Sequence, residues 1–496
     1  MSGDLDLLIV NIGDAKRKVY QDLSEDFSAV EPPFWAALTA GFIRERGYSV
    51  DIIDANVEML NNIETAEIVL KREPGLIAIV VYGQQANTCT PLMTSVGNLC
   101  TEIKKLDKKI NLILTGWHPS ALPKRTLEEE NCDFVAEGEG FYTLLGLLEK
   151  RNINDIPGLW WRENGEIRNN ARAENIKNLS SELSTVAWDL LPMDSGKYRA
   201  FNWLALSDLK SRTKCASMFT SLGCPYHCSF CAIYATYKER KMRYWGTDWV
   251  LNQIDKLVKE YEVRHLNIMD EFFIFNLQHY MPIVEGLIER DYGLNICAFA
   301  RVDAIKEEYL GKLKKAGFNW FKLGIESSST EILKRASKGK YNKEDIRKAV
   351  KATREAGISL CANFIFGLPG DSYESMQETL NLAFELNCEF PSFFAAMAPP
   401  GSDLFYEAQR KGIALPGDKG GPGWLGYAQQ GYDFMPLPTE YLSAAEVLAF
   451  RDYAFDVYFK NPRYLSMIEN KFGSDARKHT EAMTTLKLKR KLLGDQ

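Results

Sequence analysis

Several features that mark particular protein classes are missing from this chain of 496 residues. No apolar stretch approaches the roughly 20 residues that a membrane-spanning helix needs. The first residues, Met1 to Asp6, are acidic and lack the basic region of a secretory signal. The ten cysteines are too sparse for a disulfide scaffold. We therefore expect a cytoplasmic protein with no membrane span.

A basic surface of the kind that binds nucleic acid is also missing. The 60 Lys and Arg residues face 66 Asp and Glu residues, which gives a net charge of −6 at pH 7. Nucleic-acid-binding domains usually carry a basic face or stripe. The one basic run of note, Lys487 to Lys491, is typical of a solvated helix end or tail. Nucleic acid is therefore not an expected partner.

The N-terminal part of the chain alternates strand and helix patterns. Short apolar runs lie at 7–10, 50–54, 76–81 and 111–114, with a shorter one near 132–135, and helical segments such as 34–43 separate them. This alternation predicts a parallel, doubly wound α/β sheet. Two strand-like pieces around residues 160–166 then predict a small hairpin, and the sequence up to about residue 205 reads as a linker.

A second series of β/α units follows the linker. Candidate strands lie at 218–221, 266–269, 296–299, 321–325, 360–366 and 393–397, with amphipathic helical segments between them. Such a series favours a partial or full parallel barrel, in which functional residues lie at the C-terminal ends of the strands. The Gly/Pro-rich segment 416–423 then leads into a mostly helical tail. We expect a Rossmann-like domain at 1–150, a linker at 151–205, a barrel at 206–410 and a helical C-terminal region at 411–496.

Three cysteines crowd into eight residues directly after the first expected barrel strand: Cys224, Cys228 and Cys231. This spacing lets one tight loop direct three thiolates at one centre. Three protein ligands on a four-iron cluster leave one iron open to bind a further molecule. The alternative is a zinc site completed by His227 or a distant ligand. No second cysteine pair follows at zinc-ribbon spacing, so the pattern favours an iron–sulfur cluster.

The cysteine loop, with an aromatic residue just before its third cysteine, resembles that of the radical S-adenosylmethionine (radical SAM) superfamily. Five later segments resemble its strand ends in the same order: 268–273, 301–303, 324–327, 366–370 and 399–404. Each is weak alone, since such residues also form helix caps and turns, but their order is specific. The resemblance implies a 4Fe–4S cluster on the three cysteines and a SAM site built from Phe230, Asp270, Glu271, Arg301, Glu326, Ser327, Gly367 and Gly370.

The chemistry that this resemblance implies is radical chemistry. A reduced cluster donates one electron to the SAM sulfonium, and the resulting 5′-deoxyadenosyl radical takes a hydrogen atom from a substrate C–H bond. The resemblance also implies an external one-electron reductant of the flavodoxin or ferredoxin type and a small-molecule or natural-product substrate. No residue is assigned a catalytic role beyond the cofactors, and no charge cluster in the sequence identifies the substrate.

The N-terminal domain resembles the cobalamin-binding domain that one branch of this superfamily carries. The matching segments are 31–33, 50–54, 115–123 and 133–139. The resemblance implies cobalamin contacts from strand-end loops that contain Tyr82, Gly83, Gln84, Gln85, Gly116, Trp117, His118, Glu137 and Gly138. The Asp-x-His-x-x-Gly signature of the mutases is absent, so His118 is either an axial ligand or, more commonly for such a residue, a structural histidine. The alternative for the whole domain is a Rossmann-like module that has lost cobalamin.

With cobalamin bound, the expected reaction is methyl transfer from methylcobalamin to an unactivated carbon or to phosphorus. The same architecture also resembles enzymes with non-methylating radical reactions such as oxidative cyclisation or ring contraction, including the anaerobic porphyrin-ester cyclases. A corrinoid or iron–sulfur sensor without activity is a third alternative. The presence of Arg301, Glu326 and the glycine turns argues against the sensor.

Overall fold

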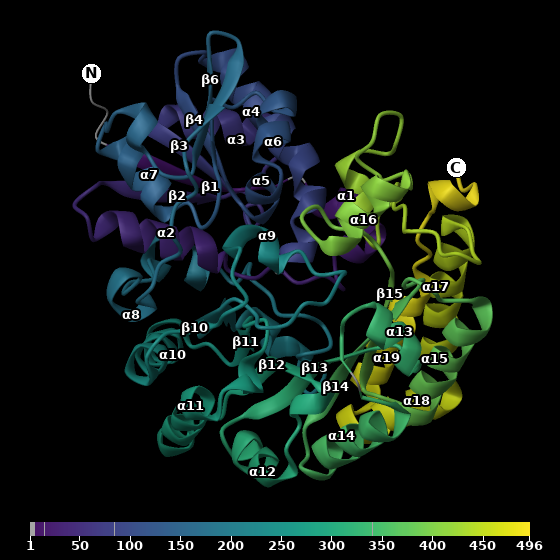
Figure 1. The fold of residues 1–496 in the computed structure, drawn as a ribbon. Helices are drawn as coiled ribbons and strands as arrows, with labels where there is room; N and C mark the ends of the chain where they lie inside the picture. Colours follow the sequence, from purple (N-terminus) through teal and green to yellow (C-terminus); the bar gives the residue numbers. More distant parts are fainter. Residues whose placement is uncertain (1–4, 14, 84, 340) are drawn as a thin grey trace.

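The computed structural model describes residues 5–496 except 14, 84 and 340, and it contains two large sheets with helices packed on them (Figure 1). The first sheet contains β1 (Leu5–Asn11), β2 (Val50–Asp54), β3 (Pro74–Val81), β4 (Asn111–Gly116), β5 (Phe134–Ala136), β6 (Leu159–Glu163) and β7 (Glu166–Asn169). The second contains β8 (Cys215–Met218), β11 (His265–Ile268), β12 (Asn295–Arg301), β13 (Phe318–Glu326), β14 (Ser359–Phe366) and β15 (Phe390–Ala395).

Helices cover both sheets. In the first half they are α1 (Lys16–Tyr20), α2 (Phe34–Arg44), α3 (Asn62–Lys71), α4 (Met93–Leu106), α5 (Trp117–Ala121), α6 (Pro123–Glu129), α7 (Phe141–Leu148), α8 (Leu179–Glu182) and α9 (Ile233–Tyr237). In the second half they are α10 (Thr247–Tyr261), α11 (Leu277–Arg290), α12 (Glu307–Lys315), α13 (Thr330–Arg335), α14 (Lys343–Glu355), α15 (Tyr373–Leu386), α16 (Asp403–Lys411), α17 (Ala444–Phe459), α18 (Pro462–Phe472) and α19 (Ser474–Thr485). Among the helices of the described chain, none combines the length and the apolar content that a bilayer span requires.

The first sheet has the strand order β2-β1-β3-β4-β5-β6-β7, and β1 to β5 run parallel. Its central strands are continuous apolar runs because helices bury both faces. The predicted hairpin forms as β6 and β7, but it pairs antiparallel with β5 and so extends the first sheet beyond residue 150. Leu159 and Trp161 of this extension are buried, so the hairpin makes apolar contacts with the core as well as pairing with β5.

The second sheet has six parallel strands in the order β15-β14-β13-β12-β11-β8. Within the described chain β8 and β15 do not pair with each other, so the sheet is the partial barrel that the sequence predicts. The first strand lies earlier than the predicted segment 218–221, because the chain leaves the barrel at Phe219. Ser221 and Leu222 instead form β9, which pairs antiparallel with β10 (Arg243–Tyr244).

Helix α2 joins the two sheets through a shared core. Nearly all of its residues are buried, as expected for a helix that is apolar on every side. The ring of Phe34 lies 5.4 Å from that of Phe219 in the barrel half and 6.0 Å from that of Trp188 in the linker. A Cβ at Gly41 would lie 2.1 Å from the carbonyl oxygen of Thr185, so the linker crosses the helix in direct backbone contact.

The C-terminal helices cover the β15 side of the barrel, where they appear in yellow in Figure 1. The hydroxyl of Tyr458 in α17 donates to the carbonyl of Cys388, and that of Tyr464 in α18 donates to the carbonyl of Glu389, each at 3.0 Å. The expected mostly helical C-terminal region is therefore confirmed. It packs on the barrel and closes one side of it.

Candidate active site

A cavity of about 750 Å³ extends from the interior of the barrel to the C-terminal ends of its strands, and it is lined by parts of the chain that are far apart in sequence. The three loop cysteines line it together with residues of β12 to β15. The first domain contributes residues 85–88, and the C-terminal region contributes Gln429 and Arg451. Its volume lies within the range of about 300–1,000 Å³ that is typical of small-molecule sites.

The cysteine loop begins with a turn that requires glycine. Gly223 has a φ of +94°, and a Cβ there would lie 2.2 Å from the carbonyl oxygen of Lys241. Two backbone hydrogen bonds then fix the loop: the N–H of Ser229 donates to the carbonyl of Ala336, and that of Cys231 donates to the carbonyl of Cys228, both at 3.0 Å.

The thiols of Cys224, Cys228 and Cys231 are free and half-buried. In the described residues, no group of three or more His, Cys, Asp or Glu side chains is arranged to hold a single metal ion. A four-iron cluster is larger, because each thiolate binds a different iron. A loop that presents three free thiols to one cavity therefore fits such a cluster. Burial raises the pKa of Cys224 to about 11, so this thiol is protonated at neutral pH.

Two buried cations lie beside the cysteine loop. The Arg301 guanidinium pairs with Asp303 through two hydrogen bonds of 2.9 Å, lies 3.6 Å from the centre of the Tyr226 ring and places Nη1 3.8 Å from Cys228 Sγ. Lys338 pairs with Glu326 at 2.7 Å, and its carbonyl accepts a further hydrogen bond from Arg301. Both cations can stabilise negative charge on the thiolates of a bound cluster.

The two acidic residues after β11 have different surroundings. Asp270 is fully buried and accepts hydrogen bonds from the N–H of Thr220 at 2.6 Å and from the hydroxyl of Ser221 at 2.6 Å, so it supports the start of the cysteine loop. Glu271 lines the cavity, and its Oε1 is buried without a partner among the described residues. Burial raises the pKa of Glu271 to about 7, and the neighbouring Asp270 adds to the rise. An unpartnered carboxyl oxygen in a cavity is suited to a ligand's ammonium group.

Glu326 and Ser327, at the end of β13, lie on different sides of the cavity wall. Glu326 lines the cavity with a φ of +63°, a backbone conformation that costs a non-glycine residue energy and is often found at functional sites. Ser327 lies outside the cavity, where its hydroxyl accepts from the N–H of Ser329 at 3.1 Å. Gly367 and Gly370 also lie outside it, in a turn in which Asp371 accepts from the N–H of Gly367 at 3.1 Å.

Of the eight residues that the sequence assigns to SAM, half line the cavity with the cysteines. These are Phe230, Glu271, Arg301 and Glu326. The other four do not line it. Asp270 and Ser327 shape loops next to lining residues, whereas Gly367 and Gly370 form the turn after β14.

The residues assigned to cobalamin lie at the C-terminal ends of β3, β4 and β5. Gln85 lines the cavity, and Gln84 lies outside the described residues. Tyr82 stacks on Trp35 with 4.5 Å between ring centres and meets Trp117 edge-on at 5.1 Å. A Cβ at Gly83 would lie 2.5 Å from Oγ1 of Thr88, so this glycine permits the turn after β3.

The remaining assigned residues make contacts within the first domain. Gly116 has a φ of +125° and abuts the backbone of β3, where a Cβ would lie 2.2 Å from the carbonyl oxygen of Val81. Glu137 accepts from Nε1 of Trp160 at 2.9 Å, and the N–H of Gly138 donates to the hydroxyl of Ser120 at 2.8 Å. Tyr82, Gly83, Gly116, Trp117, His118, Glu137 and Gly138 do not line the cavity.

His118 is buried among protein groups. Its Nδ1 lies 3.1 Å from Oγ1 of Thr90, and its ring meets that of Trp424 edge-on at 4.5 Å. Burial lowers the pKa of His118 to about 3, so the ring is neutral at pH 7. These contacts favour the structural alternative for this histidine over axial ligation.

Two tryptophans at this edge of the first sheet have unused donors. The indole N–H groups of Trp35 and Trp117 are buried and have no acceptor among the described residues. Buried donors are normally satisfied. The carboxamide-bearing rim of a corrin carries acceptors that would suit them, so the strand ends fit the cofactor that the sequence implies.

Sequence reasoning missed three residues of the site: Asn87, Lys338 and Lys322. Asn87 joins the first domain to the cysteine loop: its Nδ2 donates to the carbonyl of Phe230 at 3.3 Å, and its Oδ1 accepts from the N–H of Ala232 at 2.9 Å. Lys338 joins Glu326 to Arg301. Only Lys322 left a readable signal, because it is a charged residue in the middle of the apolar strand 321–325.

Comparison with known proteins identifies two domains in the chain. A model described as the radical SAM superfamily matches residues 218–383, and a model described as the B12 binding domain matches residues 22–148. The chain belongs to the cobalamin-dependent radical SAM enzyme family.

Individual relatives span most of the chain. A protein of Pyrococcus horikoshii named an uncharacterized methyltransferase is 28% identical over 389 residues, which cover 77% of this chain and 80% of that protein. The anaerobic magnesium-protoporphyrin IX monomethyl ester cyclase of Rubrivivax gelatinosus is 25% identical over 390 residues, covering 76% and 66%. The radical SAM methyltransferase TsrM of Kitasatospora setae, solved with tryptophan and a SAM analogue, shares the fold with a TM-score of 0.68 at 18% identity, covering 97% and 98%.

Proposed function

We propose that this protein is a cobalamin-dependent radical SAM methyltransferase that acts on a small molecule. The observation that carries the proposal is the shared cavity, in which the three cysteines meet a loop of the B12-binding domain and the interior of the barrel. When bound, the cluster supplies an electron to SAM for radical chemistry at a substrate C–H bond, and cobalamin supplies a methyl group to carbon or phosphorus.

The residues of the chain would bind and orient the cofactors and exclude water from the cavity. Cys224, Cys228 and Cys231 would hold the cluster, and Glu271 would accept from the SAM ammonium group. Arg301 and Lys338 would balance negative charge beside the cluster. The first domain and the C-terminal helices enclose the cavity, and such enclosure protects a radical from water and from side reactions.

An external one-electron donor of the flavodoxin or ferredoxin type is also part of the proposal. The cysteine loop reaches the surface, where the side chains of His227 and Asp403 lie 3.2 Å apart and each is about half exposed. A redox partner that docks on this face would come close to the cluster.

Anaerobic reconstitution tests the function. We expect the full chain to bind iron, sulfide and a corrinoid, and to form 5′-deoxyadenosine, methionine and S-adenosylhomocysteine from SAM in the presence of reductant. Cys228→Ala should lose the cluster and all reductive SAM cleavage while it keeps the corrinoid. Persistence of cleavage in this variant would refute the assignment of the cysteine loop.

A non-methylating radical reaction is the second candidate, and the similarity to the cyclase of Rubrivivax gelatinosus supports it. It predicts 5′-deoxyadenosine and methionine without S-adenosylhomocysteine and without a methylated product. Product analysis by mass spectrometry therefore separates the two candidates in one experiment.

A further inference from the structure

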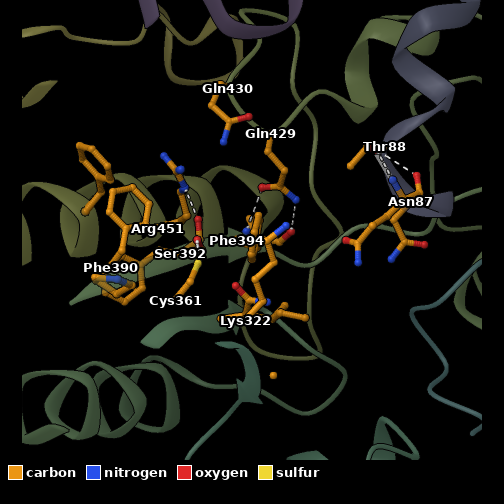
Figure 2. Close-up of a pocket in the computed structure, with 18 of the residues that line it drawn as sticks. Asn87, Thr88, Lys322, Cys361, Phe390, Ser392, Phe394, Gln429, Gln430 and Arg451 are labelled. Atoms are coloured by element: carbon orange, nitrogen blue, oxygen red, sulfur yellow. Dashed lines mark hydrogen bonds between the residues drawn. The ribbon is translucent and has the colours of Figure 1, made fainter. Parts of the chain in front are cut away.

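The interior of the barrel contains a buried cation that the proposed chemistry does not use. Strand register places Phe299, Lys322, Cys361 and Phe390 side by side in one layer across β12 to β15, which we call the barrel floor. All four residues line the cavity. Figure 2 shows Lys322, Cys361 and Phe390 around this part of the cavity, with Arg451 nearby.

Lys322 is unusual among the buried cations of the cavity. The other three each pair with a carboxylate: Arg301 with Asp303, Lys338 with Glu326 and Arg451 with Asp452. Lys322 is only 6% exposed, and within the described chain its ammonium group makes no ion pair. Buried charges are normally paired, because an unpaired charge is costly to remove from water.

The contacts of Lys322 leave donors free. Its Nζ donates to Oδ1 of Asn267 at 3.2 Å, and the amide of Asn267 in turn donates to Glu31 at 2.8 Å, so the Glu31 carboxylate reaches the lysine only through that amide. Aromatic rings supply the remaining surroundings, with the ring centres of Phe299 and Phe201 4.4 and 4.7 Å from Nζ. An ammonium group has three donors, and Asn267 uses one of them.

Lys322 faces the cavity, and the layer above the floor offers polar contacts to a ligand beside it. The same strand register places Gly324 above Lys322, with Asn363 and Ser392 beside it, and all three line the cavity. The space over Gly324 is taken by the Glu326–Lys338 pair, because a Cβ at Gly324 would lie 2.5 Å from Oε1 of Glu326 and 2.7 Å from Nζ of Lys338. Amide and hydroxyl groups beside an ammonium group suit an oxyanion.

We propose that the substrate carries a carboxylate that pairs with Lys322 on the barrel floor, and that its apolar body contacts the aromatic rings around it. A single ammonium group balances the one negative charge of a carboxylate, whereas a phosphate monoester carries about −1.5 to −2 at pH 7. This inference rests on the proposed function, since it assigns the substrate class of the same cavity.

Three probes with the same ring system test which charge the ligand must carry. Binding of 2-naphthoate, 2-naphthamide and 2-naphthyl phosphate is measured by calorimetry on the full chain, reconstituted with cluster, corrinoid and SAM and kept without reductant. We expect 2-naphthoate to bind at least tenfold more tightly than 2-naphthamide and more tightly than the phosphate. Equal binding of acid and amide, or tighter binding of the phosphate, would overturn the proposal.

Variants then assign the preference to Lys322. Lys322→Met should bind acid and amide equally, whereas Lys322→Arg, which keeps the charge, should retain the preference. Lys460→Met is the matched control, because this lysine lies in the lining of the same cavity but is half exposed and pairs with Asp456. A preference that survives in Lys322→Met, or disappears in Lys460→Met, contradicts the assignment.

The same samples keep this inference separate from the proposed function. Cluster and corrinoid content and the formation of 5′-deoxyadenosine after addition of reductant report on the radical chemistry. A parent protein that prefers the acid but forms no 5′-deoxyadenosine would sink the proposed function and leave the anion site standing. A parent protein that cleaves SAM but does not prefer the acid would refute the anion site and leave the proposed function standing.

Discussion

The contact between the two domains at Asn87 leads to a quantitative prediction. Its amide makes two hydrogen bonds to the backbone on either side of Cys231, at 3.3 Å to Phe230 and at 2.9 Å from Ala232. Each such bond stabilises by about 0.5–1.5 kcal/mol net. Asn87→Ala removes both, so local opening of the cysteine loop should become easier by about 1–3 kcal/mol.

Hydrogen exchange measures this opening directly. Since about 1.4 kcal/mol corresponds to a factor of ten, exchange of the Ala232 amide should accelerate by about 5- to 140-fold in Asn87→Ala. Asn87→Asp keeps the acceptor for the Ala232 N–H and is expected to keep most of the protection at that amide. Peptides from α17 should exchange as in the parent protein.

The result that would refute this reasoning is equally specific. If peptides over 224–235 exchange at the parent rate in Asn87→Ala, the first domain does not hold the cysteine loop, and the loop is fixed by its barrel contacts alone. If Asn87→Asp and Asn87→Ala exchange equally fast, the bond to Ala232 is not the one that matters.

Three further predictions concern stability. Gly41→Ala should lower the free energy of unfolding by about 1–3 kcal/mol, because the new Cβ would lie 2.1 Å from a linker carbonyl oxygen. Gly311→Ala is the control, since a Cβ there would meet open space. Denaturant titrations should show the control to be neutral or slightly stabilising. His118→Gln should remove about 2 kcal/mol of the acid destabilisation between pH 7 and pH 5, because burial lowers the pKa of His118 to about 3 and the parent therefore loses stability as pH falls below the unfolded value of about 6.5. Its corrinoid content should match the parent, and loss of the corrinoid would restore the axial-ligand alternative. Lys338→Met should lower the free energy of unfolding by about 3–5 kcal/mol, because it leaves the Glu326 carboxylate buried and unpaired. The double variant Lys338→Met/Glu326→Gln should recover part of that loss in thermal unfolding. A double variant no more stable than Lys338→Met would contradict this account of the pair.

Local patterns in the sequence were sufficient for the fold class and the cluster motif. The cysteine spacing is a property of one short loop, so Cys224, Cys228 and Cys231 could be read without any knowledge of tertiary contacts. Strand and helix periodicity likewise gave two parallel α/β units and a helical tail. Strand ends were less accurate: β8 ends at Met218, because pairing between β9 and β10, about 20 residues apart, pulls the chain out of the barrel.

Only the tertiary structure decided which residues share the cavity. Glu271 and Asp270 are adjacent in sequence, yet one lines the cavity and the other supports a loop, because successive side chains point in different directions. Asn87 and Lys322 gain their roles from partners more than 50 residues away. Periodicity in a sequence tells which residues are buried, but the meaning of a buried charge depends on whether the fold pairs it directly with a counter-charge. For Lys322 the described chain makes no direct ion pair, and the Glu31 carboxylate is connected to it through Asn267.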